Sequence, residues 1–292
     1  MTIDDTLERF LLQLAADGRS VHTVGQYRRH LRLLGRWARD VGHHGDQVEA
    51  LDHEAVARFL ADTAARTRPD GAAKKATSVN CLRSSLRGFF SYCHRAGFLA
   101  QDPTRLLRRA RCGVPPPRAL SKDEEERLLA TLAAAAGEEA KRDHAIIHLM
   151  LATGLRVGSV VALDLEDVDL EQGELAVRRT KGDRPERVYL GQAIKDHLRE
   201  YLKGRTSGPV FTTRQGERLN TRQVGRRFAA WVKKAGLRTA ASPQTMRHTF
   251  ATGLYQKTGD VLLVKAALRH RSIVSTLVYA RPDEERLRRA LA

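Results

Sequence analysis

A run of prolines near the middle of the chain limits what this sequence can fold into more than any other feature. The segment RCGVPPPRAL contains Gly113 and three consecutive prolines, Pro115 to Pro117. Proline fixes φ and lacks an amide hydrogen, so no helix continues through such a run and an extended linker is favoured. A chain of 292 residues is also long enough for two ordinary domains. We therefore predict a first domain at 1–112, a linker at 113–118 and a second domain at 119–292.

The residues before the linker carry a helical pattern throughout. Apolar residues recur every three or four positions, which places them on one face of an amphipathic helix. Two such stripes run from Leu7 to Leu14 and from Val24 to Trp37. A third helix is predicted after the N-cap Asp52, a fourth from about Thr77, and a short fifth at Asp102, where proline follows at the first helical position. The first domain is therefore predicted to be a small all-α bundle.

The residues after the linker combine helices with a short stretch of strand. Ser121 and Glu124 form a capping box that opens a helix, and an apolar helix from about Asp143 is broken by Gly154. Apolar and polar residues then alternate around Leu175 and again around Val188, which predicts a β-hairpin with its turn at 181–185. Further helices are predicted at 194–203, 221–235, 243–257, 260–268 and 283–291. The fold class is therefore mainly α with a small β-hairpin or sheet, in which the second domain is mixed α/β.

The charge of the chain favours a polyanionic partner. Lys and Arg total 51 against 34 Asp and Glu, so the formal net charge is +17. A field of that sign attracts nucleic acid, and basic residues exceed acidic ones both before and after the prolines. Most of the basic residues are arginine, however, and GC-rich codon usage would produce the same bias without selection for binding. Double-stranded DNA is the first candidate partner, and compositional bias is the alternative.

Composition and patterning argue against several other classes of protein. No apolar run approaches the roughly 20 residues of a membrane-spanning helix, and the N-terminus MTIDDTLERF lacks a secretion signal. We expect a cytoplasmic, nucleoid-associated protein with no membrane partner. Cys81, Cys93 and Cys112 have neither zinc-site spacing nor the density of a disulfide scaffold. Because no Gly-rich phosphate loop and no metal-ligand cluster is evident, we expect no cofactor and no bound metal.

Five polar residues in the second half could carry chemistry: Arg156, Lys181, Arg247, His270 and Tyr279. Each has an ordinary structural explanation when it is taken alone. A tyrosine near a C-terminus is usually part of the core, and a lysine in a turn is usually a solvated charge. The first arginine could cap the preceding helix, and the histidine could be a satisfied core residue. Only their combination points to a function.

Their order and spacing resemble those of the tyrosine recombinases, the Xer and phage-integrase family, over nearly the whole chain. The motifs are TGLR at 153–156, TKG at 180–182, TMRHTFAT at 245–252, and a histidine followed nine residues later by tyrosine at 270–279. The segments SVHTVGQYRRHLRLLGRWARD and ATSVNCLRSSLRGFFSYCHRAGFLAQDPTRLL also resemble the core-binding domain of this family. The resemblance implies an all-α core-binding domain followed by a catalytic domain of the tyrosine recombinase type.

The resemblance also implies a reaction and a role for each residue. Tyr279 would attack a DNA phosphodiester and form a 3′-phosphotyrosyl intermediate, while Arg156 and Arg247 would stabilise the growing negative charge. His270 would donate a hydrogen bond to a non-bridging oxygen, and Lys181 would protonate the leaving 5′ oxygen. A phenol has a pKa of about 10, so the nucleophile needs a cationic site or a base. Since the phosphotyrosyl ester conserves bond energy, the reaction requires neither metal nor nucleotide.

Three positions depart from the family pattern. Gln244 stands where the family commonly has His or Lys, and an amide cannot accept a proton, so activation of Tyr279 would depend more on the two arginines and His270. Ser159 stands where an acidic residue is usual and cannot orient Arg156 by charge. Arg269 replaces the glycine that usually precedes the histidine, which could add a phosphate contact or cost backbone freedom. We expect lowered activity rather than inactivity.

The implied partners are DNA and further copies of the chain. The family binds inverted-repeat half-sites as a clamp, with one domain on each face of the duplex, and exchanges strands within a tetramer. The tetramer could contain this chain alone or a paralogous recombinase, and an accessory DNA-bending protein could assist it. Residues 283–291 would pack on a neighbouring subunit, or else form an ordinary charged helix. Two alternatives remain: a catalytically weakened or inactive DNA-binding partner of an active paralogue, and a type IB topoisomerase.

Overall fold

A computed structural model describes most of the chain as two compact units. The described residues are 1–40, 45–113, 118–178, 186–237, 241–280, 288 and 291. The units are Met1–Val114 and Pro115–Ala292, and each has its own hydrophobic core. Three of the sequence predictions fall largely outside the described residues: the proline linker, the hairpin turn with Lys181, and the helix at 283–291.

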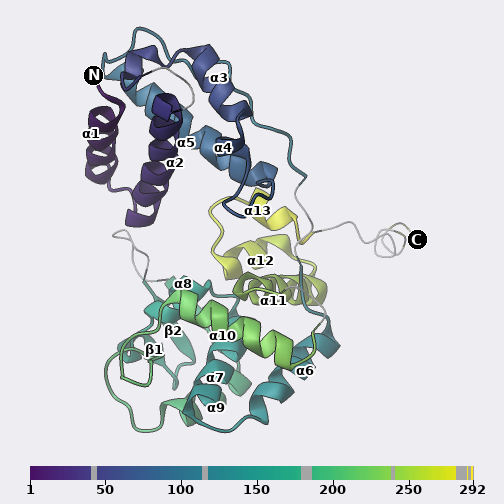
Figure 1. Cartoon of the computed structure of the whole chain (residues 1–292). Coiled ribbons are helices and arrows are strands. Elements are labelled where there is room, and N and C mark those ends of the chain that lie inside the picture. Colours follow the sequence, from purple (N-terminus) through teal and green to yellow (C-terminus); the bar gives the residue numbers. More distant parts are fainter. Residues whose placement is uncertain are drawn as a thin grey trace. The chain divides into compact units, whose positions relative to one another are not determined.

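The first unit is all-α, as predicted (Figure 1). Its α-helices are α1 Ile3–Ala16, α2 Val21–Asp40, α3 His53–Ala61, α4 Thr63–Arg66 and α5 Ala76–Arg95, with a 3-10 turn η1 at Val48–Ala50. The predicted N-cap is confirmed, because the Asp52 carboxylate accepts a hydrogen bond from the Ala55 amide at 2.8 Å. The predicted short helix at Asp102 is wrong. The segment forms a turn in which the Asp102 side chain accepts from the Thr104 amide instead.

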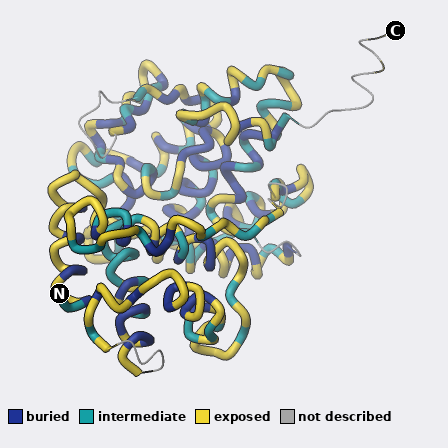
Figure 2. The backbone as a smooth tube through the Cα atoms, turned by 90° about the horizontal axis from the view of Figure 1, so that it is seen from above, coloured by how far each residue is buried: buried dark blue, intermediate teal, exposed yellow. Residues whose placement is uncertain are grey.

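Aromatic packing holds the first unit together. The Phe10 ring of α1 meets Tyr27 of α2 and Phe89 of α5 edge-on, with ring centroids 5.2 and 5.7 Å apart. Edge-to-face contacts of this kind add to the free energy gained by burying the rings. Figure 2 shows dark blue, buried positions alternating with exposed ones along the helices, as the apolar stripes predict. The stripes therefore identified the core faces correctly.

The second unit is a helical body with one small sheet (Figure 1). Its α-helices are α6 Lys122–Ala133, α7 Glu138–Thr153, α8 Val157–Ala162, α9 Gln192–Leu202, α10 Thr221–Lys234, α11 Pro243–Thr258, α12 Val261–Leu268 and α13 Val274–Leu277. The strands are β1 Val168–Asp169, β2 Glu174–Val177 and β3 Glu186–Tyr189, preceded by a 3-10 turn η2 at Leu165–Asp167. They form an antiparallel sheet in the order β1-β2-β3, in which Leu175 pairs with Val188. The mixed α/β prediction is confirmed.

Several details of the second unit differ from the sequence prediction. The hairpin has a third strand, and α7 begins at Glu138 rather than near Asp143. Gly137, with φ of 97°, starts this helix earlier because a glycine tolerates a backbone that other residues avoid. Helices α8 and α13 were not predicted, because 6 and 4 residues are too few for a 3.6-residue period to show.

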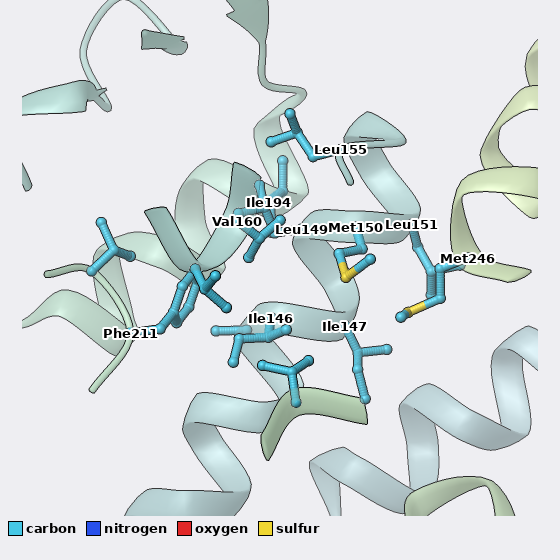
Figure 3. Close-up of a cluster of buried hydrophobic side chains, with 14 of the residues drawn as sticks. Ile146, Ile147, Leu149, Met150, Leu151, Leu155, Val160, Ile194, Phe211 and Met246 are labelled. Atoms are coloured by element: carbon cyan, nitrogen blue, oxygen red, sulfur yellow. The ribbon is translucent and has the colours of Figure 1, made fainter. Parts of the chain in front are cut away.

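Helix α7 is the centre of the larger core. Its side chains Ile146, Ile147, Leu149 and Met150 are almost fully buried. Figure 3 shows Met246 of α11 lying beside this helix in the same cluster. Because Met246 is fixed in the core, its neighbours along α11 are held in place as well.

The end of α7 requires a glycine. Gly154 has φ of 63°, in the left-handed region that favours glycine, and caps the helix. A Cβ atom at this position would lie 2.3 Å from Cδ1 of Phe250 in α11, which is too close for any side chain. The glycine therefore lets α7 and α11 approach each other where the candidate site forms.

Neither a membrane-spanning helix nor a cluster of metal ligands is found among the described residues. None of the described helices is both long and apolar enough to cross a membrane. Across the described ranges, no group of three or more His, Cys, Asp or Glu side chains is placed to hold a metal ion. Three half-buried histidines lie together between α7 and α9: His144, His148 and His197. Nδ1 of His148 and Nδ1 of His197 are 2.8 Å apart. They pack these two helices against each other.

Candidate active site

Four of the sequence-predicted site residues meet where the C-terminal ends of α7 and α12 reach α11. Arg247 lies in α11, Arg156 is the N-cap of α8, and His270 and Tyr279 follow α12 and α13. The positive charges of Arg156 and Arg247 act on the side chains of His270 and Tyr279. Lys181 lies outside the described residues.

Arg247 is held in place by backbone carbonyls. Its side chain is buried, and its guanidinium donates to the Gly154 oxygen at 2.6 Å and to the Leu268 oxygen at 2.5 Å. These are carbonyls at the C-terminal ends of α7 and α12, which lack partners within their own helices. A guanidinium has more N–H groups than these two bonds use, so further donors remain for a ligand.

The site is crowded with positive charge. Burial, and then repulsion by Arg156 and Arg269, lower the pKa of Arg247 to about 10. The guanidinium therefore stays protonated at neutral pH, but it does so next to other cations. The side chain of Arg156 is exposed and can reach a ligand. An anion bound here would relieve the repulsion, and bidentate guanidinium groups suit a phosphate.

Tyr279 presents a buried phenol to this charge. Its side chain is 7% exposed and packs against Ala251, Val264 and Leu268. Burial raises the pKa of the phenol, and the two arginines oppose that rise by favouring the phenolate. Its hydroxyl lies 2.6 Å from Nδ1 of His248. Tyr279 therefore has both a cationic environment and a hydrogen-bond partner.

His270 is positioned by Thr276. Nδ1 of His270 lies 2.8 Å from the Thr276 hydroxyl, which is fully buried, and the Thr276 carbonyl accepts from the Tyr279 amide at 3.0 Å. One threonine thus links the histidine to the tyrosine. Burial, followed by the charges of Arg247 and Arg156, lowers the pKa of His270 to about 4. The imidazole is therefore neutral at neutral pH and still carries one N–H donor.

Sequence reasoning missed two residues of this site. Thr276 gave no signal, because a threonine in a short helix is common. His248 stands in the TMRHTFAT motif, but no role was assigned to it. Gln244, which was assigned a role, is exposed near the start of α11. Ser159 is half-buried, and its amide donates to the Arg156 carbonyl at 2.8 Å, which closes the first turn of α8.

Arg269 has an unusual backbone. Its φ is 54° and its ψ is 43°, which places this non-glycine residue in the left-handed region. Its side chain is largely buried and its Nε lies 3.7 Å from a carboxylate oxygen of Glu186 at the start of β3. A left-handed conformation costs an ordinary residue about 1 kcal/mol. The replacement of the usual glycine therefore carries a backbone cost.

This cost can be measured with two variants. Arg269→Gly and Arg269→Ala both remove the side chain, so the difference between them isolates the backbone. We expect the glycine variant to be more stable than the alanine variant by about 1 kcal/mol in urea denaturation. Equal stabilities would mean that residue 269 is not left-handed in solution.

Two family profiles match this chain. The profile described as the phage integrase family matches residues 118–286, and the phage integrase N-terminal SAM-like domain matches residues 7–97. The chain is 32% identical to tyrosine recombinase XerD of Ralstonia nicotianae, over 97% of this chain and 92% of the relative. It is 31% identical to XerD of Pseudomonas aeruginosa, over 96% and 94%. It is also 28% identical to XerA of Thermococcus kodakarensis, over 98% and 94%.

Solved structures share the fold. An integrase of the Tn1549 transposon, in complex with circular intermediate DNA, gives a TM-score of 0.78 at 18% identity, covering 100% of this chain and 99% of that one. A lambda integrase dimer bound to a COC′ core site gives 0.74 at 22% identity, covering 96% of each chain. At these identities the likeness concerns the fold alone.

Proposed function

Because this chain belongs to the phage integrase family of tyrosine recombinases, we propose that it cuts and rejoins DNA with Tyr279 as its nucleophile. The chain is a site-specific tyrosine recombinase, and DNA is its partner. One observation supports the assignment of the site above all others. A buried tyrosine hydroxyl lies within the field of a buried arginine that is already crowded by other cations.

The arrangement suggests how cleavage proceeds. The scissile phosphate binds between Arg247 and Arg156, and its charge relieves their repulsion. The Tyr279 oxygen forms a bond to phosphorus, the bond from phosphorus to the 5′ oxygen breaks, and a 3′-phosphotyrosyl ester results. His270, neutral and held by Thr276, donates to a non-bridging oxygen. Rejoining reverses these steps, with a 5′ hydroxyl as the nucleophile.

Two site assignments rest on the resemblance to the family alone. We assign protonation of the leaving 5′ oxygen to Lys181, whose hairpin position matches the general acid of the family. Gln244 matches the usual His or Lys position, but an amide cannot take a proton there. We assign Gln244 at most a hydrogen bond to the phosphate.

The proposed target is a duplex with inverted-repeat half-sites. The net charge of +17 supports phosphate contacts, which give affinity that falls steeply with salt. We propose that residues 1–112 and 119–292 form separate domains, joined by the linker at 113–118, and that both bind the duplex. The bound DNA in the Tn1549 and lambda integrase structures supports this assignment by analogy.

We further propose that strand exchange takes place in a tetramer on DNA. Apolar side chains of and around α12 and α13 are exposed in the isolated chain: Leu262, Leu263, Ile273, Val274 and Leu277. Such a patch supports contact with another protein surface. Residues 283–291 of a neighbouring chain are the candidate occupant. The neighbour can be a second copy or a paralogue, with or without a DNA-bending protein.

Residence of the protein in the cytoplasm stays a prediction.

Neither alternative function is favoured. The relatives are named as tyrosine recombinases, which favours an active enzyme over a weakened partner of a paralogue. A type IB topoisomerase would share the nucleophile, but the match to the integrase N-terminal domain argues against it. Relaxation of supercoiled DNA by the monomer would support that alternative.

The proposed function is tested by trapping. Wild-type protein is incubated with fragmented genomic DNA of its source, denatured, and the DNA that stays covalently attached is sequenced. We expect fragments that share an inverted repeat, joined to Tyr279 as located by mass spectrometry of the adduct peptide. Salt-sensitive binding without any adduct would contradict the proposed reaction and favour the non-catalytic partner.

A further inference from the structure

The family position for a proton acceptor is occupied here by a side chain that cannot accept one. Gln244 is exposed near the start of α11, and its amide has no basic nitrogen. His248 lies four residues later, and residues four apart lie on the same face of a helix. An imidazole thus occupies the same face of α11 one turn further on.

The geometry of His248 fits a base for Tyr279. Its Nδ1 lies 2.6 Å from the phenol oxygen, which is the reacting atom, and this is the spacing of a strong hydrogen bond. The two rings are 5.6 Å apart between centroids, and the imidazole is half-buried. A general base must be within hydrogen-bond reach of the proton that it takes. Among the described residues, His248 is the titratable side chain hydrogen-bonded to this hydroxyl.

We propose that His248 is the general base that activates Tyr279, and so replaces the basic residue that Gln244 lacks. The inference rests on the proposed function. In cleavage, the Tyr279 oxygen bonds to phosphorus while its proton passes to Nδ1 of His248, and the 5′ oxygen leaves with a proton from the acid assigned to Lys181. In rejoining, His248 returns that proton to the departing phenol oxygen. Atoms and charge balance without an external reagent.

The charges around His248 are consistent with this role. Burial, and then the charge of Arg247, lower the pKa of His248 below its usual value of 6.5. The imidazole is therefore neutral at neutral pH and can accept a proton. The other groups in the cluster are His270, which is neutral as well, and Arg156. The imidazolium formed in the reaction lies next to Arg247, and the negative charge of the bound phosphate offsets their repulsion.

Two variants of His248 show whether it acts as a base or only positions Tyr279. His248→Ala removes both the hydrogen bond and the basicity, whereas His248→Asn can keep a hydrogen bond to the phenol but cannot take its proton. His197→Ala, which removes a half-buried imidazole from α9, is the matched control. The substrate is a nicked duplex oligonucleotide built from the fragment that wild type captures, so that the adduct accumulates.

We expect both His248 variants to form the adduct at least about 100-fold more slowly than wild type, and His197→Ala to form it at the wild-type rate. Each variant should bind the duplex as wild type does, which shows that it is folded. Recovery of the wild-type rate in His248→Asn would overturn the assignment as a base and leave His248 a positioning residue. Failure of wild type itself to form an adduct would instead contradict the proposed function.

The dependence on pH gives a second readout. In wild type the adduct rate should be flat above about pH 7, because His248 is already neutral there. In His248→Ala the rate should rise about tenfold per pH unit toward the pKa of a phenol, since the tyrosine must ionise by itself. Profiles of the same shape would contradict the inference.

Addition of Gln244→His to His248→Ala should restore part of the rate, because it places a base one turn away.

Discussion

Tyr279→Phe is expected to abolish covalent capture of DNA and to leave DNA binding unchanged. The substitution removes one oxygen atom from a side chain that is otherwise packed against Ala251, Val264 and Leu268. The ring can keep those contacts, so the loss of stability should be small. Without the hydroxyl no phosphotyrosyl ester can form, and the expected loss of adduct exceeds about 10⁴-fold.

The measurement is denaturing electrophoresis of the protein with a labelled duplex, alongside a native binding assay. Tyr255→Phe is the matched control, because Tyr255 also packs on this small cluster but has no role in the proposed reaction. The control should form the adduct normally. Persistence of an adduct in Tyr279→Phe would show that another nucleophile attacks the DNA, and the assignment of the site would then be wrong.

Arg247→Lys is expected to slow adduct formation by about 10²–10³-fold although it keeps the positive charge. An ammonium cannot reproduce the planar fork with which Arg247 reaches both Gly154 and Leu268, and it has no comparable set of donors left for a phosphate. The variant should also melt at a lower temperature, because two buried carbonyls lose their donor. The duplex should bind with little change, since the chain has 51 Lys and Arg residues and Arg247 is only one of them.

Arg205→Lys separates the chemical effect from the structural one. Arg205 likewise donates to two backbone carbonyls, those of Val210 and Pro209, but at another place in the second unit. We expect this control to lose some stability and to keep its rate of adduct formation. If Arg247→Lys reacted as fast as the control, the planar guanidinium group of Arg247 would have no part in the reaction.

The sequence predicted the fold class. Arg247, His270 and Tyr279 each lie in a motif of fixed length, and the structure brings them together. Their roles in the reaction stay predictions. The apolar stripes predicted the long helices, because a helical period is visible over three or more turns. In a short segment, hydrogen bonds between side chains and the backbone decide the structure instead. The sequence at Asp102 predicts the start of a helix, yet the Asp102 carboxylate accepts hydrogen bonds from the amide and the hydroxyl of Thr104 and forms a turn.

The contact between His248 and Tyr279 was beyond sequence reasoning for a different reason. The two residues are 31 positions apart and belong to α11 and to the segment after α13, a helix of only 4 residues that was not predicted. The motif places a histidine beside Arg247 but does not say which way it faces. That direction follows from the burial of Met246 in the larger core, because residues two apart point to nearly opposite sides of a helix.

The way in which Arg247 is anchored has a consequence for how DNA is accepted. The ionisable groups that act on this guanidinium, within the described residues, are Arg156, Arg269 and Tyr279, and its hydrogen bonds go to peptide oxygens. Peptide oxygens are permanent dipoles that neither titrate nor carry a full charge. Within the part of the chain that the structure describes, no carboxylate pairs with Arg247, so a phosphodiester need not displace one from it. Mild acid cannot loosen the anchor by protonating it. Ser159, at a position where the family usually has an acid, fits a site whose charge is kept available for the backbone of the DNA.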